Sequence, residues 1–385
     1  MKLPVYLDNH STTPLDDRVL EAMLPYFREN YGNPSSAGHS YGWIAEAAVR
    51  NARERIADSI GASPDEIIFT SGTTESNNLV IKGLASAYSS RRNHFITSVV
   101  EHPAVIEPLR SLEKYGFMTT FLPVDKYGLI DLQELEDSIT PETLLVSIMT
   151  ANNEIGTISP VDEIAAICSS KGVYFHTDAA QAAGKMKFDV KLNNADLVSF
   201  SAHKIYGPKG IGALYIRKKT PKIKIAAQLH GGGQERDLRS GTLNVPAIVG
   251  FAKAMEVSQS GLTEEFSRVQ QLRDRLSDGI MSQLSGIVLN GHPEKRLPNN
   301  LNISIKGVNI DTLLLRLRDL ALSSGSACAS GKQEPSHVLK AIGVDRDLLK
   351  STLRFGIGRF NTIEEIDYTI KRFIEAVNET RNEIL

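Results

Sequence analysis

Apolar runs and helical segments alternate along the middle of the chain. Short apolar runs predict strands over residues 67–70, 95–99, 144–149, 173–177 and 197–201, and a last run returns through Gly210 to Tyr215. Helical spacing follows several of them, up to Tyr88 and from near Pro103 and Pro160. Such alternation is typical of a mostly parallel sheet covered by helices on both faces. Ligands bind such sheets beyond the carboxyl ends of the strands, so we expect the chemistry there.

The pattern changes after Pro246. Helices are predicted over residues 245–259, 263–284, 310–320 and 363–378, and strands over 301–305 and 352–355. A chain of 385 residues is too long for one simple core. We therefore predict an α/β large domain over residues 15–260. A smaller α+β domain would combine residues 1–14 with 261–385, with the boundary placed only roughly.

Composition excludes several classes of protein. The formal net charge of −2 gives no reason to expect nucleic acid or an acidic membrane as a partner. No apolar run is long enough to span a bilayer, and a strand-like pattern starts directly after Met1, which leaves no room for a signal peptide. Two cysteines argue against a disulfide-built secreted protein. We expect a cytoplasmic protein without a metal site.

Two residues at neighbouring strand ends suggest a cofactor. Lys204 ends the run that follows Leu197 and Val198, and Asp178 ends the upstream apolar run, with Gln181 just after it. A lysine can condense with the aldehyde of pyridoxal phosphate, and an aspartate can keep the ring nitrogen protonated so that the ring accepts electrons. Taken singly, Asp178 could cap a helix and Lys204 could be a solvated loop residue. Their joint placement favours the cofactor.

Polar groups suited to a phosphate lie at similar places. Thr73 and Thr74 follow Gly72 at a strand-to-helix turn, where free N–H groups and the helix dipole attract anions, although threonine is also an ordinary helix cap. Ser201 and His203 could add donors beside Lys204. A Gly-rich stretch over residues 230–233 and 240–242 is either a flexible surface loop or a phosphate loop that reaches a neighbouring subunit.

Three further side chains allow two interpretations each. His102 could cap a helix, or stack on a pyridine ring and move protons. Asn153 could bond a substrate carboxylate or a ring hydroxyl, or simply form a turn. Arg354 lies in the apolar run Leu353–Gly356. Its planar fork suits a substrate carboxylate or, with comparable weight, a structural salt bridge.

The two cysteines have different surroundings. Cys328 lies among small residues, Ala321 to Gly331, a composition typical of a mobile loop, so we expect an exposed and reactive thiol. Cys168 lies in the apolar helical stripe Ile164–Cys168 and is expected in the core.

Motifs along nearly the whole chain resemble those of group I cysteine desulfurases, a family that supplies sulfur for iron–sulfur clusters. The matching runs lie, in order, at residues 6–14, 70–78, 101–102, 152–156, 178–181, 201–210, 230–236, 239–242, 324–328 and 354–355. The resemblance implies fold type I of the pyridoxal-phosphate-dependent transferases. It departs at Asn9-His10, where Ala-Ala or Asn-Ala is common, and the chain lacks the C-terminal tail with which bacterial housekeeping members dock a scaffold protein.

The resemblance also implies a role for each site residue. Lys204 would carry the cofactor and transfer protons, Asp178 would pair with the ring nitrogen, Gln181 with the ring oxygen, and His102 would stack on the ring. The phosphate would be held by Thr73, Thr74, Ser201 and His203, with Thr242 from the other subunit of a homodimer. Arg354, Asn153 and Asn33 would anchor the substrate carboxylate. Cys328 would take the sulfur of L-cysteine as a persulfide, leaving L-alanine, with His102 helping to deprotonate a thiol.

Other activities remain open from the sequence. A selenocysteine lyase or a cysteine sulfinate desulfinase could use the same scaffold, and an aminotransferase or a non-catalytic scaffold is a more distant possibility. The sulfur acceptor could be an iron–sulfur scaffold protein, a sulfur carrier or a tRNA-modifying enzyme.

Overall fold

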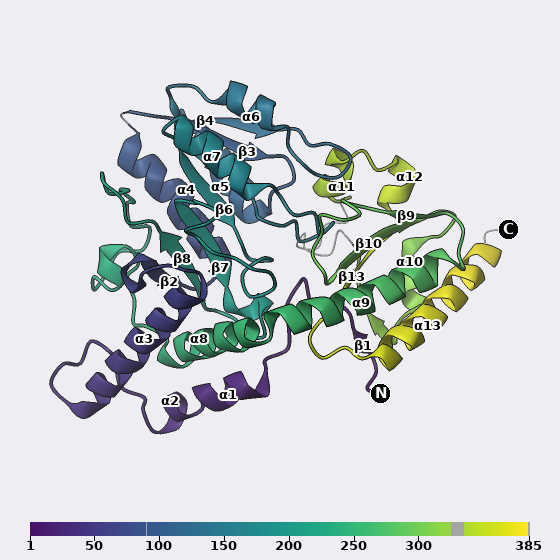
Figure 1. The fold of residues 1–385 in the computed structure, drawn as a ribbon, viewed down its shortest axis with the longest axis horizontal. Helices are drawn as coiled ribbons and strands as arrows, with labels where there is room; N and C mark the ends of the chain where they lie inside the picture. Colours follow the sequence, from purple (N-terminus) through teal and green to yellow (C-terminus); the bar gives the residue numbers. More distant parts are fainter. Residues whose placement is uncertain (90, 325–334, 384–385) are drawn as a thin grey trace.

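The computed structural model describes residues 1–89, 91–324 and 335–383. A seven-stranded sheet forms the centre of the large lobe (Figure 1). Its strands, in spatial order, are β2 (Ile67–Thr70), β8 (Gly212–Ile216), β7 (Leu197–Ser201), β6 (Tyr174–Asp178), β5 (Thr143–Ser147), β3 (His94–Ser98) and β4 (Met118–Leu122). The strands from β7 to β4 are parallel to their neighbours, whereas β8 runs antiparallel to both β7 and β2. The predicted, mostly parallel sheet is confirmed.

Both faces of this sheet are covered by helices. The helices of the large lobe are α1 (Asp17–Met23), α2 (Pro25–Arg28), α3 (Ser40–Ser59), α4 (Thr73–Tyr88), α5 (Pro103–Glu113), α6 (Leu132–Ser138), α7 (Val161–Ser170) and α8 (Val245–Ser260). Alternate residues of one strand enter different cores: Val198 and Phe200 of β7 pack with α3 and α8, and Leu197 packs with α4 and α5. A strand with both faces buried reads as a continuous apolar run, which is why the sequence pattern was clear.

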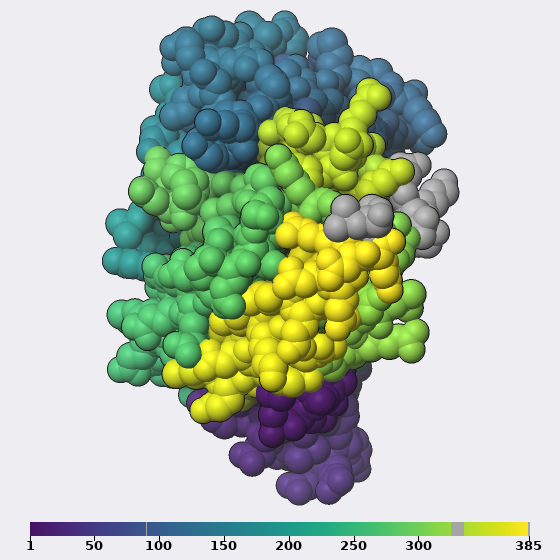
Figure 2. Space-filling model, turned by 90° about the vertical axis from the view of Figure 1, so that its right-hand side faces the viewer, coloured from purple at the N-terminus to yellow at the C-terminus, as the bar shows by residue number. Residues whose placement is uncertain are grey.

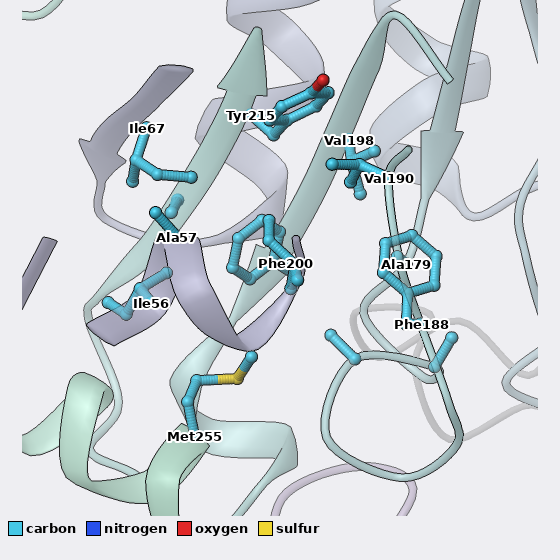
Figure 3. Packing of buried hydrophobic residues seen from close by; sticks show 14 of the residues in the cluster. Ile56, Ala57, Ile67, Ala179, Phe188, Val190, Val198, Phe200, Tyr215 and Met255 are labelled. Atoms are coloured by element: carbon cyan, nitrogen blue, oxygen red, sulfur yellow. The ribbon is translucent and has the colours of Figure 1, made fainter. Parts of the chain in front are cut away.

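The first of these cores is dense around Phe200. Figure 3 shows the Phe200 ring among side chains from the sheet, with Met255 of α8 below it and Ile56 of α3 beside it. All three side chains are fully buried. The rings of Phe200 and Phe251 lie 5.8 Å apart, a favourable spacing for an aromatic pair. This packing fixes the carboxyl end of β7, from which the next residues enter the site.

The small lobe is built on a second, antiparallel sheet. Its strands, in spatial order, are β12 (Ser323–Ser324), β13 (Thr352–Gly356), β10 (Asn300–Ile305) and β9 (Ile287–Leu289), and β1 (Val5–Tyr6) pairs separately with β11 (Leu320–Ala321). The helices are α9 (Leu262–Met281), α10 (Ile310–Arg316), α11 (His337–Ala341), α12 (Arg346–Leu349) and α13 (Ile363–Asn382). Figure 2 shows α13 lying beside α9 across this lobe. Val5 and Leu7 join the core of this lobe.

Several predicted boundaries were wrong, and some elements were not predicted. The helix expected over 310–320 ends at Arg316, because Leu320 and Ala321 pair with β1. The last helix runs on to Asn382. Helices α1–α3 and strand β4 were missed; β4 is an edge strand with only one buried residue, so its apolar signal is weak. No helix in the described ranges combines the length and apolarity that crossing a membrane requires.

Candidate active site

A cavity of about 510 Å³ opens where the large-lobe strands end. Its size suits a cofactor together with a small substrate. The predicted site residues that line it are Thr73, Thr74, His102, Asn153, Asp178, Gln181, His203, Lys204 and Arg354. They come from the first turn of α4, the start of α5, the connection between β5 and α7, the ends of β6 and β7, and β13 of the small lobe. The structure therefore brings most of the predicted site together.

The turn before α4 forms an anion cradle. Gly72 adopts φ +152°, a backbone conformation that residues with a side chain rarely adopt, and precedes the helix. The backbone of Gly72 also packs against Gly212 of β8, where an added Cβ would lie 2.6 Å from the Gly72 Cα. Thr73 Oγ1 and Ser201 Oγ are buried hydroxyls for which the described residues offer no hydrogen-bond partner. Unpaired buried donors at a helix N-terminus fit a phosphate group.

Asp178 and His102 face the cavity and are both held by their neighbours. Asp178 Oδ2 accepts from Asn77 Nδ2 at 2.9 Å, and Oδ1 accepts from the Ala180 N–H at 2.9 Å. His102 caps α5, because its Nδ1 accepts from the Ala104 N–H at 3.1 Å. Burial lowers the pKa of His102 below its usual range. Because Nδ1 accepts from the Ala104 N–H, the neutral ring carries its proton on Nε2. His102 thus caps α5 and also lines the cavity.

Glu101, the residue before His102, is a buried acid below the cavity. Its Oε1 accepts from the Met149 N–H at 2.8 Å and from Ser98 Oγ at 3.1 Å. Burial, with the nearby charge of Asp178, raises the pKa of Glu101 to about 8. The carboxyl group is therefore largely protonated at neutral pH and adds no full negative charge beside Asp178.

Lys204 and His203 follow β7 in a short 3₁₀ turn. Lys204 Nζ donates to the carbonyl oxygens of His10 and Ser11, each at 2.7 Å. His203 Nδ1 lies 3.2 Å from Thr12 Oγ1, and burial lowers the pKa of His203 to about 4. The residues that hold the amine thus belong to the N-terminal segment, which crosses from the small lobe to the cavity.

Arg354 reaches the cavity from β13 and is 2% exposed. Its Nη2 donates to Asp8 Oδ1 at 2.8 Å and to Ser11 Oγ at 2.7 Å, and its Nη1 donates to the Asn153 carbonyl at 2.9 Å. These bonds use three of the five N–H groups of a guanidinium. The structural salt bridge is thus present, since Arg354 pairs with Asp8, and the interpretation of Arg354 as a substrate-carboxylate anchor stays a prediction.

The segment 325–334, which contains Cys328, lies outside the described residues, but both of its ends are anchored at the site. Ser323 of β12 pairs with Arg354 itself. On the other side, Ser336 Oγ donates to Glu154 Oε2 at 2.5 Å, and His337 Nε2 lies 2.9 Å from the Glu101 carbonyl. Cys328 follows Ser324 by four residues in the sequence.

Two predicted site residues lie elsewhere in this chain. Asn33 is exposed and its Oδ1 accepts from the Ser35 N–H at 2.9 Å. Thr242 is exposed as well, and neither residue lines the cavity. Cys168, in contrast, is buried in α7 as predicted, and burial raises the pKa of its thiol to about 12, which keeps it unreactive.

The segment between the two Gly-rich runs is hydrogen-bonded to the edge of the large-lobe sheet, a contact that was not predicted from the sequence. Glu235, Arg236 and Asp237 all have positive φ, between 48° and 63°. The Glu235 carboxylate accepts from the Phe69 N–H at 2.7 Å on the open edge of β2 and pairs with Arg53 at 2.5 Å. Three consecutive left-handed residues other than glycine are unfavourable, so these contacts hold the turn in place.

No cluster of three or more metal-binding side chains occurs within residues 1–89, 91–324 and 335–383. Around the cavity, hydroxyl groups and Lys204 can donate to a phosphate, and the Asp178 carboxylate can accept from a protonated ring nitrogen.

Comparison with known proteins gives a consistent picture. The family model for class-V aminotransferases matches residues 5–369. A human cysteine desulfurase is 54% identical over 378 residues, which cover 98% of this chain and 82% of the relative. The cysteine desulfurase IscS of Rickettsia bellii is 52% identical over 380 residues, covering 99% of this chain and 92% of the relative.

Solved structures agree with these sequences. A NifS-like protein superimposes with a TM-score of 0.91 at 42% identity, covering 97% of this chain and 99% of that one. The structure described as SspA in complex with cysteine gives a TM-score of 0.82 at 36% identity, covering 93% and 100% of the two chains.

Proposed function

The chain belongs to the class-V aminotransferases and, within them, to the cysteine desulfurases, and from this premise we propose that its cavity converts L-cysteine to L-alanine and passes the sulfur to Cys328. The observation that carries the proposal is the convergence, on one cavity of about 510 Å³, of Lys204, Asp178, the unpaired buried hydroxyl of Thr73 and the partly used guanidinium of Arg354. Strand β12, which precedes the segment containing Cys328, pairs with Arg354 through Ser323 and supports it.

The residues present fit pyridoxal phosphate, on which this family depends. Thr73, Thr74, Ser201 and His203 would hold the phosphate, and Asp178 the ring nitrogen, with His102 stacked on the ring. Lys204 would hold the cofactor covalently. When bound, the cofactor supplies a positively charged ring that accepts the electrons of the broken Cα–H bond of the substrate.

The side chains of the protein divide the remaining tasks. Arg354, with Asn153, orients the substrate carboxylate, since a fixed fork holds a carboxylate in one plane. The Lys204 amine removes and returns protons at the substrate carbons. The Cys328 thiolate forms an S–S bond with the substrate sulfur as the substrate C–S bond breaks. L-cysteine and one thiol thus become L-alanine and one persulfide, with no external oxidant.

Finer points of the proposal concern partners. A homodimer would bring Thr242 to the phosphate of the neighbouring subunit, and its exposure in this chain leaves it accessible to one. Asn33 would join Arg354 and Asn153 at the substrate carboxylate. A sulfur-acceptor protein in the cytoplasm, such as an iron–sulfur scaffold or a sulfur carrier, would take the persulfide from Cys328.

One assay tests the activity. The purified protein is loaded with pyridoxal phosphate and mixed with L-cysteine and a reductant, and alanine and sulfide are measured. We expect equal amounts of both, and almost none from Cys328→Ala. Formation of pyruvate, or full activity of Cys328→Ala on L-cysteine, would contradict the proposal. Full activity of that variant on L-selenocysteine alone would favour the selenocysteine lyase.

A further inference from the structure

A buried hydrogen-bonded network lies behind Gln181, the cavity residue that follows β6. Gln181 Oε1 accepts from Lys185 Nζ at 2.8 Å and lies 3.1 Å from His10 Nδ1, while Gln181 Nε2 donates to the His10 carbonyl at 3.0 Å. Gln181 and His10 are 4% and 1% exposed.

The network determines which way the Gln181 amide points. A carbonyl oxygen accepts only, so the atom next to the His10 carbonyl is the amide nitrogen. The atom next to Lys185 is then the amide oxygen, which a protonated lysine, being a donor only, also requires. The His10 carbonyl therefore resolves the usual ambiguity of amide oxygen and nitrogen here.

The protonation of His10 follows from the other side of its ring. Asn300 Oδ1 accepts from Arg296 at 2.9 Å, and Asn300 Nδ2 donates to the Glu154 carbonyl at 3.1 Å, so Asn300 presents a donor to His10 Nε2 at 3.2 Å. His10 Nε2 is then an acceptor, and its proton is on Nδ1, where it can be donated to Gln181. The Asn299 carbonyl, also 3.2 Å from Nε2, is then a contact without a hydrogen bond.

The charges around the network favour this arrangement. Burial, together with the positive charges of Lys185 and Arg354, lowers the pKa of His10 well below its usual range, so the ring stays neutral. Burial also lowers the pKa of Lys185 to about 7; Lys204 and Arg354 act in the same direction, and Glu265 opposes them. Charged or neutral, the Lys185 amine retains N–H groups for Gln181 Oε1.

We propose that Lys185 and His10 are positioning residues that occupy the oxygen of the Gln181 amide, so that Gln181 can offer only an N–H donor to the ring oxygen of a bound pyridoxal cofactor. One amide N–H is used by the His10 carbonyl, and the second is what the side chain has left for the cavity it lines. The inference rests on the cofactor named in the proposed function, and adds two residues that act on it through Gln181.

A donor on the ring oxygen stabilises its ionised form and weakens its hold on the neighbouring proton. The test is a pH titration of the visible absorbance of the loaded protein, without substrate. Lys185→Met and His10→Ala each remove one of the two groups that donate to Gln181 Oε1. In both variants we expect the midpoint of the absorbance titration to rise by about 0.5–1 pH unit. Lys187→Met, which changes an exposed lysine two positions later, is the matched control and should leave the midpoint unchanged.

A double-mutant cycle separates positioning from a direct effect of charge. Each substitution is repeated in a Gln181→Ala background, where a residue that acts through Gln181 has nothing left to position. We expect both shifts to vanish there. A shift of Lys185→Met that persists in that background, or an unchanged midpoint in both single variants, overturns the inference.

Failure of the positioning role can be distinguished from failure of the proposed function. If Lys185→Met does not fold, His10→Ala, which removes a neutral ring, carries the test alone. If the wild-type protein fails to bind the cofactor, the proposed function fails. A normally loaded variant with an unchanged midpoint contradicts only the positioning role.

Discussion

The two sheets present their polar groups to the cavity in different ways. On the large-lobe side, the buried hydroxyls Thr73 Oγ1 and Ser201 Oγ at the ends of the strands have no partner among the described residues. From the small lobe, Arg354 of β13 reaches the cavity with its guanidinium already bonded to Asp8, Ser11 and the Asn153 carbonyl. The large-lobe hydroxyls are thus open for a ligand, whereas Arg354 uses three of its five N–H groups within the protein and is held in position by them.

The difference has a physical reason. A group that must bind a removable cofactor stays unpaired in its absence, and this costs stability. A group that orients a substrate needs a fixed direction, which a bonded network provides. Substitutions in the two lobes should therefore separate ligand affinity from stability of the protein.

The largest effect is expected at Lys204. Lys204→Ala removes both the covalent anchor and the proton-transfer group of the large lobe, and should reduce turnover by roughly 10²–10⁴-fold or more, the usual contribution of a positioned acid–base group. The visible absorbance of the loaded protein should change as well. Alanine production and the spectrum are measured, with Lys187→Ala as the control. Near-normal turnover by Lys204→Ala would contradict the role of Lys204 as cofactor anchor and proton-transfer group.

Arg354 tests the small lobe. Arg354→Gln removes a substrate donor and leaves Asp8 without its partner. We expect KM for L-cysteine to rise by roughly 10–100-fold, as for the loss of hydrogen bonds to a charged group, together with a clear loss of thermal stability. Steady-state kinetics and melting curves are compared. A raised KM with an unchanged melting temperature would show that the hydrogen bonds of Arg354 do not stabilise the folded protein.

For Ser201 we expect the reverse of Arg354, a loss of cofactor affinity without a loss of stability. Because Ser201 Oγ has no protein partner among the described residues, Ser201→Ala should leave the melting temperature of the cofactor-free protein unchanged or slightly raised. The dissociation constant of pyridoxal phosphate should rise by about 10-fold, for one lost hydrogen bond to a charged group. A titration of the cofactor-free protein measures it. A lower melting temperature of Ser201→Ala with an unchanged dissociation constant would contradict the interpretation that Ser201 Oγ is left unpaired for the cofactor.

The smallest effect is expected from Glu101 and depends on pH. Its pKa is raised to about 8 in the folded protein, whereas an unfolded glutamate titrates near about 4.3. The folded state thus binds more protons in this window, and the contribution to stability falls as pH rises through it. Glu101→Gln should remove this fall, by up to about 1.4 kcal/mol per pH unit.

Urea unfolding of the wild type and Glu101→Gln at pH 7, 7.5 and 8 measures the difference. The range is chosen because the buried His176 and His203 have pKa values lowered to about 3 and about 4. Their contributions change with the opposite sign, and mainly below their unfolded pKa of about 6.5. Lys185, whose pKa is lowered to about 7, also contributes with the opposite sign and does so within this range, so the effect of Glu101 is taken from the difference between the two proteins. Parallel curves for the two proteins would indicate that Glu101 is ionised when folded.

The sequence predicted the parts of the molecule that depend on local pattern. The alternating runs from Ile67 onward gave the large-lobe sheet, and the rule that ligands bind at strand ends placed Asp178 and Lys204 on one cavity. The small-lobe strands around Leu301 and Thr352 were also found.

The rest depends on contacts between distant residues. His10 and Gln181 are 171 positions apart, and Glu235 and Phe69 are 166 apart, so no local pattern could reveal either pair. Arg354 could not be assigned to a salt bridge or a ligand site from its own run, because its partners Asp8 and Asn153 come from other segments.

The central claim is that the sulfur of L-cysteine moves to Cys328, and mass spectrometry of that thiol tests it most directly. The loaded protein is mixed with L-cysteine without reductant, digested, and the Cys328 and Cys168 peptides are compared. The account predicts a gain of one sulfur atom on the Cys328 peptide, lost on adding a thiol reductant, and none on the peptide of the buried Cys168. Release of alanine with no added sulfur on Cys328 would contradict it.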